Sequence, residues 1–168
     1  MKRLPIFFDT EFTSLEVDAR MLSAGFVSAD GQELYVEVKD SVDPAKCSPF
    51  VLETVLPLLQ GGSHLFTLSE IVRKLKGWIE AMNSEVVLVS DLPAIDWPLI
   101  HDLFEAYGWP ENLSKRCEPM SFWIPKHSEE VFHCALEEYW LEHESKRHHA
   151  LIDAMSLFES WKCIGVMA

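Results

Sequence analysis

The chain has 168 residues and an ordinary globular composition, with 48% hydrophobic and 24% charged residues. It carries 27 acidic residues against 14 Lys and Arg residues, which gives a formal net charge of −13. This charge argues against a protein that grips duplex nucleic acid over many phosphates, because such binding depends on Lys and Arg. An enzyme that acts on nucleic acid is not excluded, since clustered carboxylates can hold metal ions that contact the phosphate.

The length predicts one continuous domain over residues 1–168, and the sequence shows no repeat and no linker. No apolar run approaches the roughly 18 residues that a membrane span requires, so we expect no membrane association. The cysteines are scattered and contain no C-x-x-C pair; they are Cys47, Cys117, Cys134 and Cys163. Thiols spaced in this way indicate a reduced, cytoplasmic protein.

The first part of the chain predicts a β-meander. Residues 4–8 are an apolar run that ends at Asp9, which indicates a buried strand. Residues 21–29 and 33–38 are two further strand candidates. The Asp30-Gly31 pair between them is a strong hairpin signal.

Helices and one interior strand are predicted for the rest of the chain. Residues 85–90 contain a wholly apolar run, which is typical of a strand covered on both faces. Apolar residues at helical spacing predict a helix that Ser69 caps and that ends near residue 82. Further helices are expected at residues 49–59, with an interruption at Pro57, and at residues 96–107, 129–142 and 149–164. This order predicts an α/β fold with a mixed sheet flanked by helices.

Asp9 and Glu11 form a D-x-E pair directly after the first predicted strand. Residues two apart point to the same side of an extended chain, so both carboxylates can face one cavity. Hard divalent ions such as Mg²⁺ and Mn²⁺ take oxygen ligands of this kind. The alternative is an exposed acidic strand end that has no function.

Two aspartates follow the predicted interior strand. Asp96 stands at the expected start of a helix, where a carboxylate either caps the helix or serves a site. Asp91 is nearer to the strand end and competes for the same role.

A histidine-rich segment precedes the last expected helix. His149 and Asp153 are four residues apart and would share a helix face, whereas His148 reaches the same site only from a loop or the helix start. A histidine with a pKa near neutrality can take a proton from water. The alternative is a solvated, basic helix start, since Lys146 and Arg147 come directly before.

The combination and order of these segments carry more information than any one of them. The sequence reads FFDTEFTSL at residues 7–15, VSDLPAID at residues 89–96 and HHALIDA at residues 148–154. In this order the segments resemble the motifs of the RNase H-like 3′–5′ exonucleases of the DEDD superfamily. The similarity is to the histidine-bearing branch, which includes oligoribonuclease, ribonuclease T and proofreading exonucleases. It implies an RNase H-like mixed sheet, with an antiparallel meander and parallel strands, flanked by helices.

The resemblance also implies roles for the site residues. The ligands of two divalent ions, Mg²⁺ or Mn²⁺, would be Asp9, Glu11, Asp96 and Asp153. The general base would be His148, and not His149, because Ala150 and Ala154 set the register of the motif.

The chain departs from the family pattern at two positions. Ser14 stands where the family often has Gly, and Leu92 stands where it commonly has Asn. Asp91 is the neighbouring candidate for part of the role of that Asn.

Three residues are candidates for contact with the substrate. Phe12 can stack on the terminal base, or it can belong to the core. Arg147 can meet a phosphate, or it can be a solvated charge. Thr10, inside the D-x-E pair, is the third candidate.

The activity that the resemblance implies is a metal-dependent 3′–5′ exonuclease. Such an enzyme releases nucleoside 5′-monophosphates from the 3′ end of single-stranded nucleic acid, with RNA or short oligoribonucleotides favoured here. The resemblance also makes a homodimer an expected state. The alternatives are a DNA 3′–5′ exonuclease or proofreading component, and a non-catalytic adaptor that keeps the fold.

Overall fold

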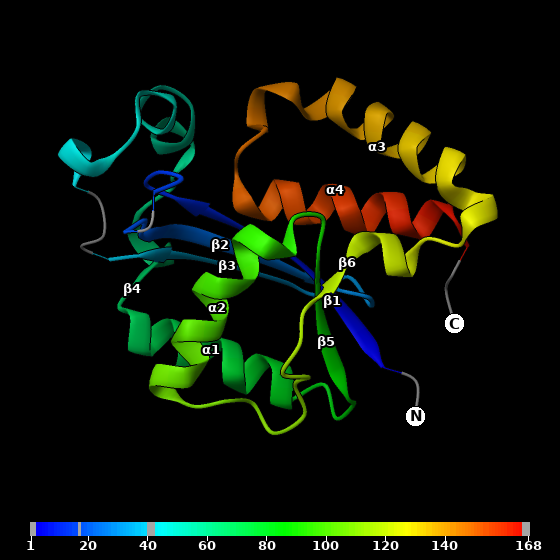
Figure 1. The fold of residues 1–168 in the computed structure, drawn as a ribbon, viewed down its shortest axis with the longest axis horizontal. Coiled ribbons are helices and arrows are strands. Elements are labelled where there is room, and N and C mark those ends of the chain that lie inside the picture. Colours follow the sequence, from blue (N-terminus) through cyan, green and yellow to red (C-terminus); the bar gives the residue numbers. More distant parts are fainter. Residues whose placement is uncertain (1–2, 17, 40–42, 166–168) are drawn as a thin grey trace.

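A six-stranded sheet forms the centre of the computed structural model, counted over the residues that it describes, which are 3–16, 18–39 and 43–165 (Figure 1). The strand order is β4-β3-β2-β1-β5-β6. The strands are β1 Leu4–Phe12, β2 Met21–Ser28, β3 Glu33–Val38, β4 Leu65–Phe66, β5 Val86–Ser90 and β6 Glu118–Pro119. The two ends of the predicted domain 1–168 lie outside the described residues.

The sheet is mixed, as the sequence predicts. Strands β1, β2 and β3 form an antiparallel meander. Strand β5 pairs parallel to β1, β6 pairs parallel to β5, and β4 pairs parallel to β3. The expected α/β class and the combination of a meander with parallel strands are therefore confirmed.

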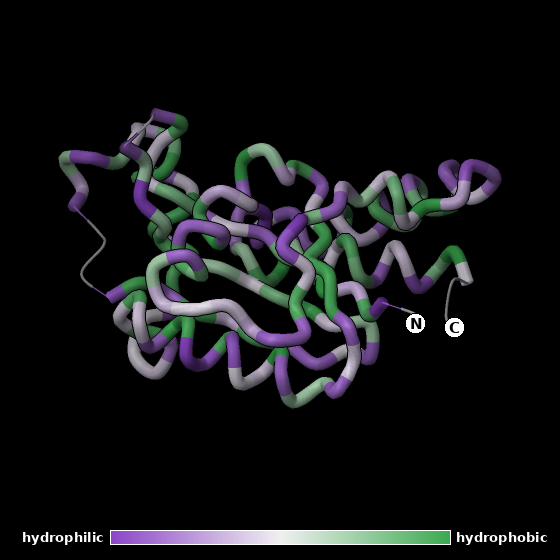
Figure 2. The backbone as a smooth tube through the Cα atoms, turned by 60° about the horizontal axis from the view of Figure 1, so that its bottom comes forward, coloured by the Kyte–Doolittle hydropathy of each residue, from purple (hydrophilic) through white to green (hydrophobic). Residues whose placement is uncertain are grey.

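Helices cover both faces of this sheet. They are α1 Leu68–Glu80, α2 Pro93–Tyr107, α3 Glu129–His143 and α4 Ala150–Cys163. Successive residues of β1 point to opposite faces, so Ile6 and Phe8 pack with α1 and α2, whereas Phe7 packs with α4. Figure 2 shows the helices alternating between hydrophilic and hydrophobic segments, as expected of helices with one buried face.

Several boundaries differ from the expected ones. Strand β1 continues through Phe12, so the D-x-E pair lies within the strand and not after it. Helix α1 is capped by Thr67, which forms a capping box with Glu70, and not by Ser69. Helix α2 begins at Pro93, because proline suits the first helical turn, and this places Asp96 inside the helix.

The segment at 49–59 is helical from residue 49 to residue 58, as expected, but its helical geometry is mixed. A π-helical turn, Val51–Val55, is followed by a 3₁₀ turn, Leu56–Leu58, that contains Pro57. Proline lacks the amide hydrogen that a longer helix would need at this point. The other 3₁₀ turns are Pro44–Lys46, Gly62–His64, Met120–Trp123, Lys126–Ser128 and Glu144–Lys146. No helix among the described residues combines the length and apolar character needed to cross a membrane.

Candidate active site

A cavity of about 670 Å³ opens at the end of β1. Its walls come from the segment around Phe50 and Val55, from the start of α2, and from α3 with the segment before α4. All of the site residues predicted from the sequence line it: Asp9, Thr10, Glu11, Phe12, Asp96, Arg147, His148 and Asp153. The structure therefore brings these residues together, although they come from segments far apart in the chain.

The first group of possible metal ligands in the cavity involves α4. Glu11, His148 and Asp153 each offer one ligand atom, and these atoms lie within 4.8 Å of one another. Glu11 comes from β1, and the other two residues come from the turn before α4 and from its first turn. We call these three residues the α4 cluster.

The second group involves α2. Asp9, Asp91 and Asp96 also offer one carboxylate oxygen each within 4.8 Å of one another. Asp91 follows β5 and is exposed, whereas Asp96 lies in the first turn of α2 and is only 3% exposed. We call these three residues the α2 cluster.

Strand β1 supplies one carboxylate to each cluster. Asp9 and Glu11 are two residues apart on the strand, so they share the face that Phe7 turns toward α4. The strand is held on both sides, antiparallel to β2 and parallel to β5, which fixes the direction of both side chains. The register shifts between Glu11 and Phe12, and this irregularity ends the regular pairing just after the pair.

Asp96 is held by hydrogen bonds from two neighbouring elements. The Thr10 hydroxyl and the Thr10 amide donate to Asp96 Oδ1, at 2.8 and 3.2 Å. The Ser90 hydroxyl donates to Asp96 Oδ2 at 2.5 Å, and it accepts a bond from the Leu92 amide. Leu92 occupies the cap position of α2, so Asp96 does not serve as the cap. Burial nevertheless raises the pKa of Asp96 to about 6, against the lowering effect of these bonds.

His148 stands in a strained turn directly before α4. Its φ is 72°, in the left-handed region, which costs a residue with a side chain about 1 kcal/mol. Its amide donates to Asp153 Oδ2 at 3.1 Å, and its ring meets the Phe50 ring edge-on at 4.9 Å. Burial, together with the charge of Arg147, lowers the pKa of His148. The imidazole is therefore neutral at pH 7 and able to accept a proton.

The other carboxyl groups of the cavity have raised pKa values. Burial, followed by the charges of Asp153 and Asp96, raises the pKa of Glu11 to about 9. Burial also raises the pKa of Asp153 to about 7, and it raises that of Asp9 well above its ordinary value. A bound cation would offset this crowding of negative charge, which is a common reason for such a cluster.

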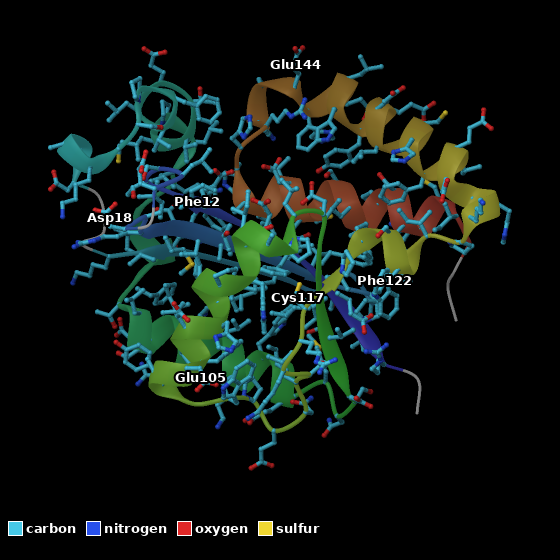
Figure 3. All side chains as sticks on the ribbon, viewed as in Figure 1. Phe12, Asp18, Glu105, Cys117, Phe122 and Glu144 are labelled. Atoms are coloured by element: carbon cyan, nitrogen blue, oxygen red, sulfur yellow. The ribbon has the colours of Figure 1, made fainter. Side chains whose placement is uncertain are left out.

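The three candidate substrate contacts occupy different parts of the cavity. Phe12 is half-buried at the end of β1, where Figure 3 labels it. Thr10 is buried and its hydroxyl is bonded to Asp96. Arg147 is exposed, with its guanidinium 5.3 Å from the centre of the Trp140 ring. Their contact with a substrate stays a prediction.

Some contributors to the site lacked a sequence signal. Ser90 and Phe50 contact Asp96 and His148, but nothing in a single sequence marks one serine or one phenylalanine for such a contact. Trp140 joins the cavity because α3 packs on α4, which is a tertiary effect. His149, expected to share a helix face with Asp153, instead precedes α4 and is absent from the cavity lining.

The fold is similar to that of solved exonuclease I structures. One structure of exonuclease I covers 94% of this chain with a TM-score of 0.60 and 12% identity. A zinc-bound complex of E. coli exonuclease I with single-stranded DNA covers 98%, with a TM-score of 0.60 and 11% identity. A complex of E. coli exonuclease I with a dT13 oligonucleotide also covers 98%, with a TM-score of 0.58 and 9% identity.

The likeness to these structures establishes the fold alone. The sequence identities are too low to assign a function to this chain from them. The chain spans 39% to 41% of the length of the three exonuclease I chains. The sequence matches no model of a known protein family, and it matches no curated protein sequence.

Proposed function

We propose that this chain is a divalent-metal-dependent 3′–5′ exonuclease that acts on single-stranded nucleic acid. The observation that carries the proposal is the meeting of the α4 cluster and the α2 cluster in one cavity. The order of the three sequence motifs and the fold shared with exonuclease I support it. A product of the reaction would be a nucleoside 5′-monophosphate.

The residues of the cavity fit divalent metal ions. Asp153 Oδ1 is buried and has no hydrogen-bond partner among the described residues, which leaves an oxygen free to bind a cation. Hard ions such as Mg²⁺ and Mn²⁺ prefer carboxylate oxygens. The proposed ligands are Asp9, Glu11, Asp96 and Asp153, with Asp91 beside them. When bound, the ions would activate water and stabilise negative charge on the phosphate and on the leaving oxygen.

The chain itself provides the base and its orientation. His148, neutral at pH 7, accepts the proton of the attacking water at an imidazole nitrogen. The Phe50 ring against its edge and the bond from its amide to Asp153 restrict where the imidazole can lie. This arrangement keeps the base beside the carboxylates, as general-base catalysis requires.

The cavity suits the end of a single strand better than a long duplex. Phe12, Leu15 and Phe50 give it an apolar wall on which bases can stack, and such stacking tolerates any sequence. Arg147 is the only cation among the described residues that line it. With a formal charge of −13, the chain offers few partners for a continuous run of phosphates.

The sugar of the substrate remains a matter for experiment. The resemblance of the three sequence motifs favours RNA, whereas solved exonuclease I complexes contain single-stranded DNA. A DNA exonuclease is therefore the second candidate function. The expected homodimer is a further prediction, which light scattering on the purified protein tests.

The deciding experiment uses matched RNA and DNA oligonucleotides, labelled at either end and incubated with Mg²⁺, Mn²⁺ or EDTA. We expect the 3′-labelled strands to release a labelled mononucleotide at once, and the 5′-labelled strands to give a descending ladder. EDTA should abolish both. The ratio of the RNA and DNA rates identifies the preferred sugar.

A matched pair of aspartates on α2 controls this assay. Asp96→Asn should remove activity, whereas Asp102→Asn should retain it, because Asp102 is an exposed residue six positions later in the same helix. Oligonucleotide binding without hydrolysis, together with no Mn²⁺ binding in calorimetry, would instead support the non-catalytic adaptor. Activity that persists in EDTA would contradict the proposal.

A further inference from the structure

Two rows of side chains cross the meander on the face that α4 covers. From β1 through β2 to β3, the rows are Asp9, Gly25 and Tyr35, and Glu11, Ser23 and Glu37. A Cβ atom on Gly25 would lie 2.3 Å from the Leu151 Cα, so the start of α4 rests directly on β2. The helix start therefore lies between the proposed metal ligands of β1 and a second polar pair on β3.

The two adjacent histidines of the third motif have different surroundings. His148 lines the cavity, whereas His149 is 7% exposed and stacks on the Tyr35 ring at 4.5 Å, with 26° between the planes. His149 Nε2 lies 2.9 Å from Gln60 Nε2. An amide nitrogen only donates, so His149 Nε2 accepts in this contact, and His149 Nδ1 is buried without a partner among the described residues.

Glu37 closes this arrangement into a ring of contacts. Its carboxyl group is 1% exposed and accepts three hydrogen bonds. Oε1 accepts from the Tyr35 hydroxyl at 2.9 Å and from the Gln60 amide at 2.6 Å. Oε2 accepts from the Gly61 amide at 2.9 Å. A buried carboxyl group with three donors is held in one orientation, and it holds the loop of Gln60 in turn.

We propose that His149, Tyr35, Glu37 and Gln60 form a positioning unit that fixes the turn carrying His148. None of the four lines the cavity, so the unit acts through the backbone and not by touching the substrate. The inference rests on the proposed exonuclease function, in which His148 is the base. It assigns the second histidine of the motif a role that is separate from proton transfer.

The backbone bonds of His149 connect the unit to the active site. The His149 amide donates to the Lys146 carbonyl at 3.2 Å, which closes the turn around His148. The His149 carbonyl accepts from the Asp153 amide at 3.0 Å, which fixes the first turn of α4. His148 adopts a left-handed φ of 72° between these anchors. A shift of the His149 ring would therefore move the base and a proposed metal ligand together.

Two variants and one control test the positioning unit. Glu37→Gln replaces one acceptor oxygen with a donor, and His149→Phe keeps a ring on Tyr35 but removes the acceptor for Gln60. Glu33→Gln is the control, because Glu33 lies four residues earlier on β3 and is exposed. We expect roughly a 10- to 100-fold loss of kcat in both variants, the range for residues that support an active-site ligand. The KM of both variants for the oligonucleotide should stay near the wild-type value. The control, Glu33→Gln, should keep the wild-type kcat and KM.

Hydrogen exchange provides a readout that does not depend on activity. In the metal-free protein, the His148 amide should exchange roughly tenfold faster or more in both variants, while amides of β5 keep their rates. Equal acceleration of the β5 amides would show a purely structural role and would overturn the proposal, as would an unchanged kcat. If wild type hydrolyses nothing with either metal, the exonuclease function fails, and the exchange rates alone decide whether the unit positions His148.

Discussion

The two clusters in the cavity use the same chemistry but differ in how their charges are satisfied. In the α2 cluster, Asp96 receives hydrogen bonds from Thr10 and Ser90. In the α4 cluster, Asp153 Oδ2 accepts one bond from the His148 amide, and Oδ1 is buried without a partner among the described residues. The α4 cluster is thus the less satisfied of the two in the absence of a cation.

The pKa values of the carboxyl groups are raised in both clusters. In the α4 cluster, the pKa values of Glu11 and Asp153 are raised to about 9 and about 7. In the α2 cluster, that of Asp96 is about 6 and that of Asp9 is raised well above its ordinary value. Burial is the leading cause in each case, and hydrogen bonds from Ser90 and Thr10 limit the rise for Asp96. Carboxyl groups that are held near one another with few hydrogen-bond donors gain from a bound cation. A cation bound at either cluster would therefore relieve the crowding of negative charge.

The largest expected effect comes from removing one charge in the α4 cluster. Asp153→Asn keeps an oxygen to accept the His148 amide but removes a proposed metal ligand. We expect kcat/KM to fall by more than about 100-fold, beyond the range for residues that only support a ligand. The metal-free variant should melt at the same temperature as wild type or higher, because a crowded charge is gone. Steady-state kinetics and calorimetric melting measure these effects.

The control for this variant lies on the same helix. Glu159→Gln removes a carboxylate from α4 that pairs with Lys162 and does not line the cavity. Its activity should match wild type. Normal hydrolysis by Asp153→Asn would remove Asp153 from the proposed ligand set.

The next effect is the response of stability to metal and pH. Glu11 and Asp153 hold their protons to higher pH in the folded, metal-free state than in the unfolded state. The folded state then binds more protons, so stability falls as pH rises from about 4 toward 9. Metal competes with these protons and should therefore stabilise the protein more at pH 8 than at pH 6.

The size of this metal effect can be estimated. A ligand at 100 times its Kd adds about 2.7 kcal/mol, which for a chain of this size corresponds to about 5 to 10 °C in Tm. Differential scanning fluorimetry with Mn²⁺, reversed by EDTA, measures it. A Tm that does not respond to Mn²⁺ at pH 8 would contradict metal binding at the α4 cluster.

A smaller effect is expected from the exposed member of the α2 cluster. Asp91→Asn should weaken binding of the second ion by roughly tenfold, the lower range for a supporting residue. High Mn²⁺ should restore the lost activity, because the ion's other ligands, Asp9 and Asp96, are unchanged. Titration calorimetry follows both ions. An unchanged binding isotherm would show that Asp91 is only a neighbour of the site.

The sequence predicts the sheet and the gathering of the site because both follow from patterns that repeat along the chain. The period of two in β1 places Asp9 and Glu11 on one face, and the motif order places Asp96 and Asp153 near them. The bounds of β3 also agree with the prediction, since Asp30-Gly31 forms the turn before it. The two-residue strands β4 and β6 could not be predicted, because an alternation of polar and apolar residues needs more than two residues to be recognised.

The error at the start of α1 has a local cause, and the error at the start of α4 has a tertiary one. Thr67 and Ser69 are both good capping residues, and the reach of Glu70 back to the Thr67 amide decides between them. His149 satisfies helical spacing with Asp153, yet its ring stacks on Tyr35 from a strand distant in sequence. The spacing of four residues applies only inside a helix, and α4 begins at Ala150, one residue after His149.

The smallest expected effect separates support from substrate contact at Thr10. Thr10→Val keeps the shape and the amide bond but removes the hydroxyl that donates to Asp96 Oδ1. The loss of one such bond costs about 1 kcal/mol of stability, and activity should fall modestly through kcat. Ser90→Ala, which removes the other hydroxyl donor to Asp96, is the matched variant and should behave alike. A rise in KM for Thr10→Val but not for Ser90→Ala would instead show that Thr10 contacts the substrate, as the sequence suggested. The hydroxyl of Thr10 would then serve the substrate as well as Asp96.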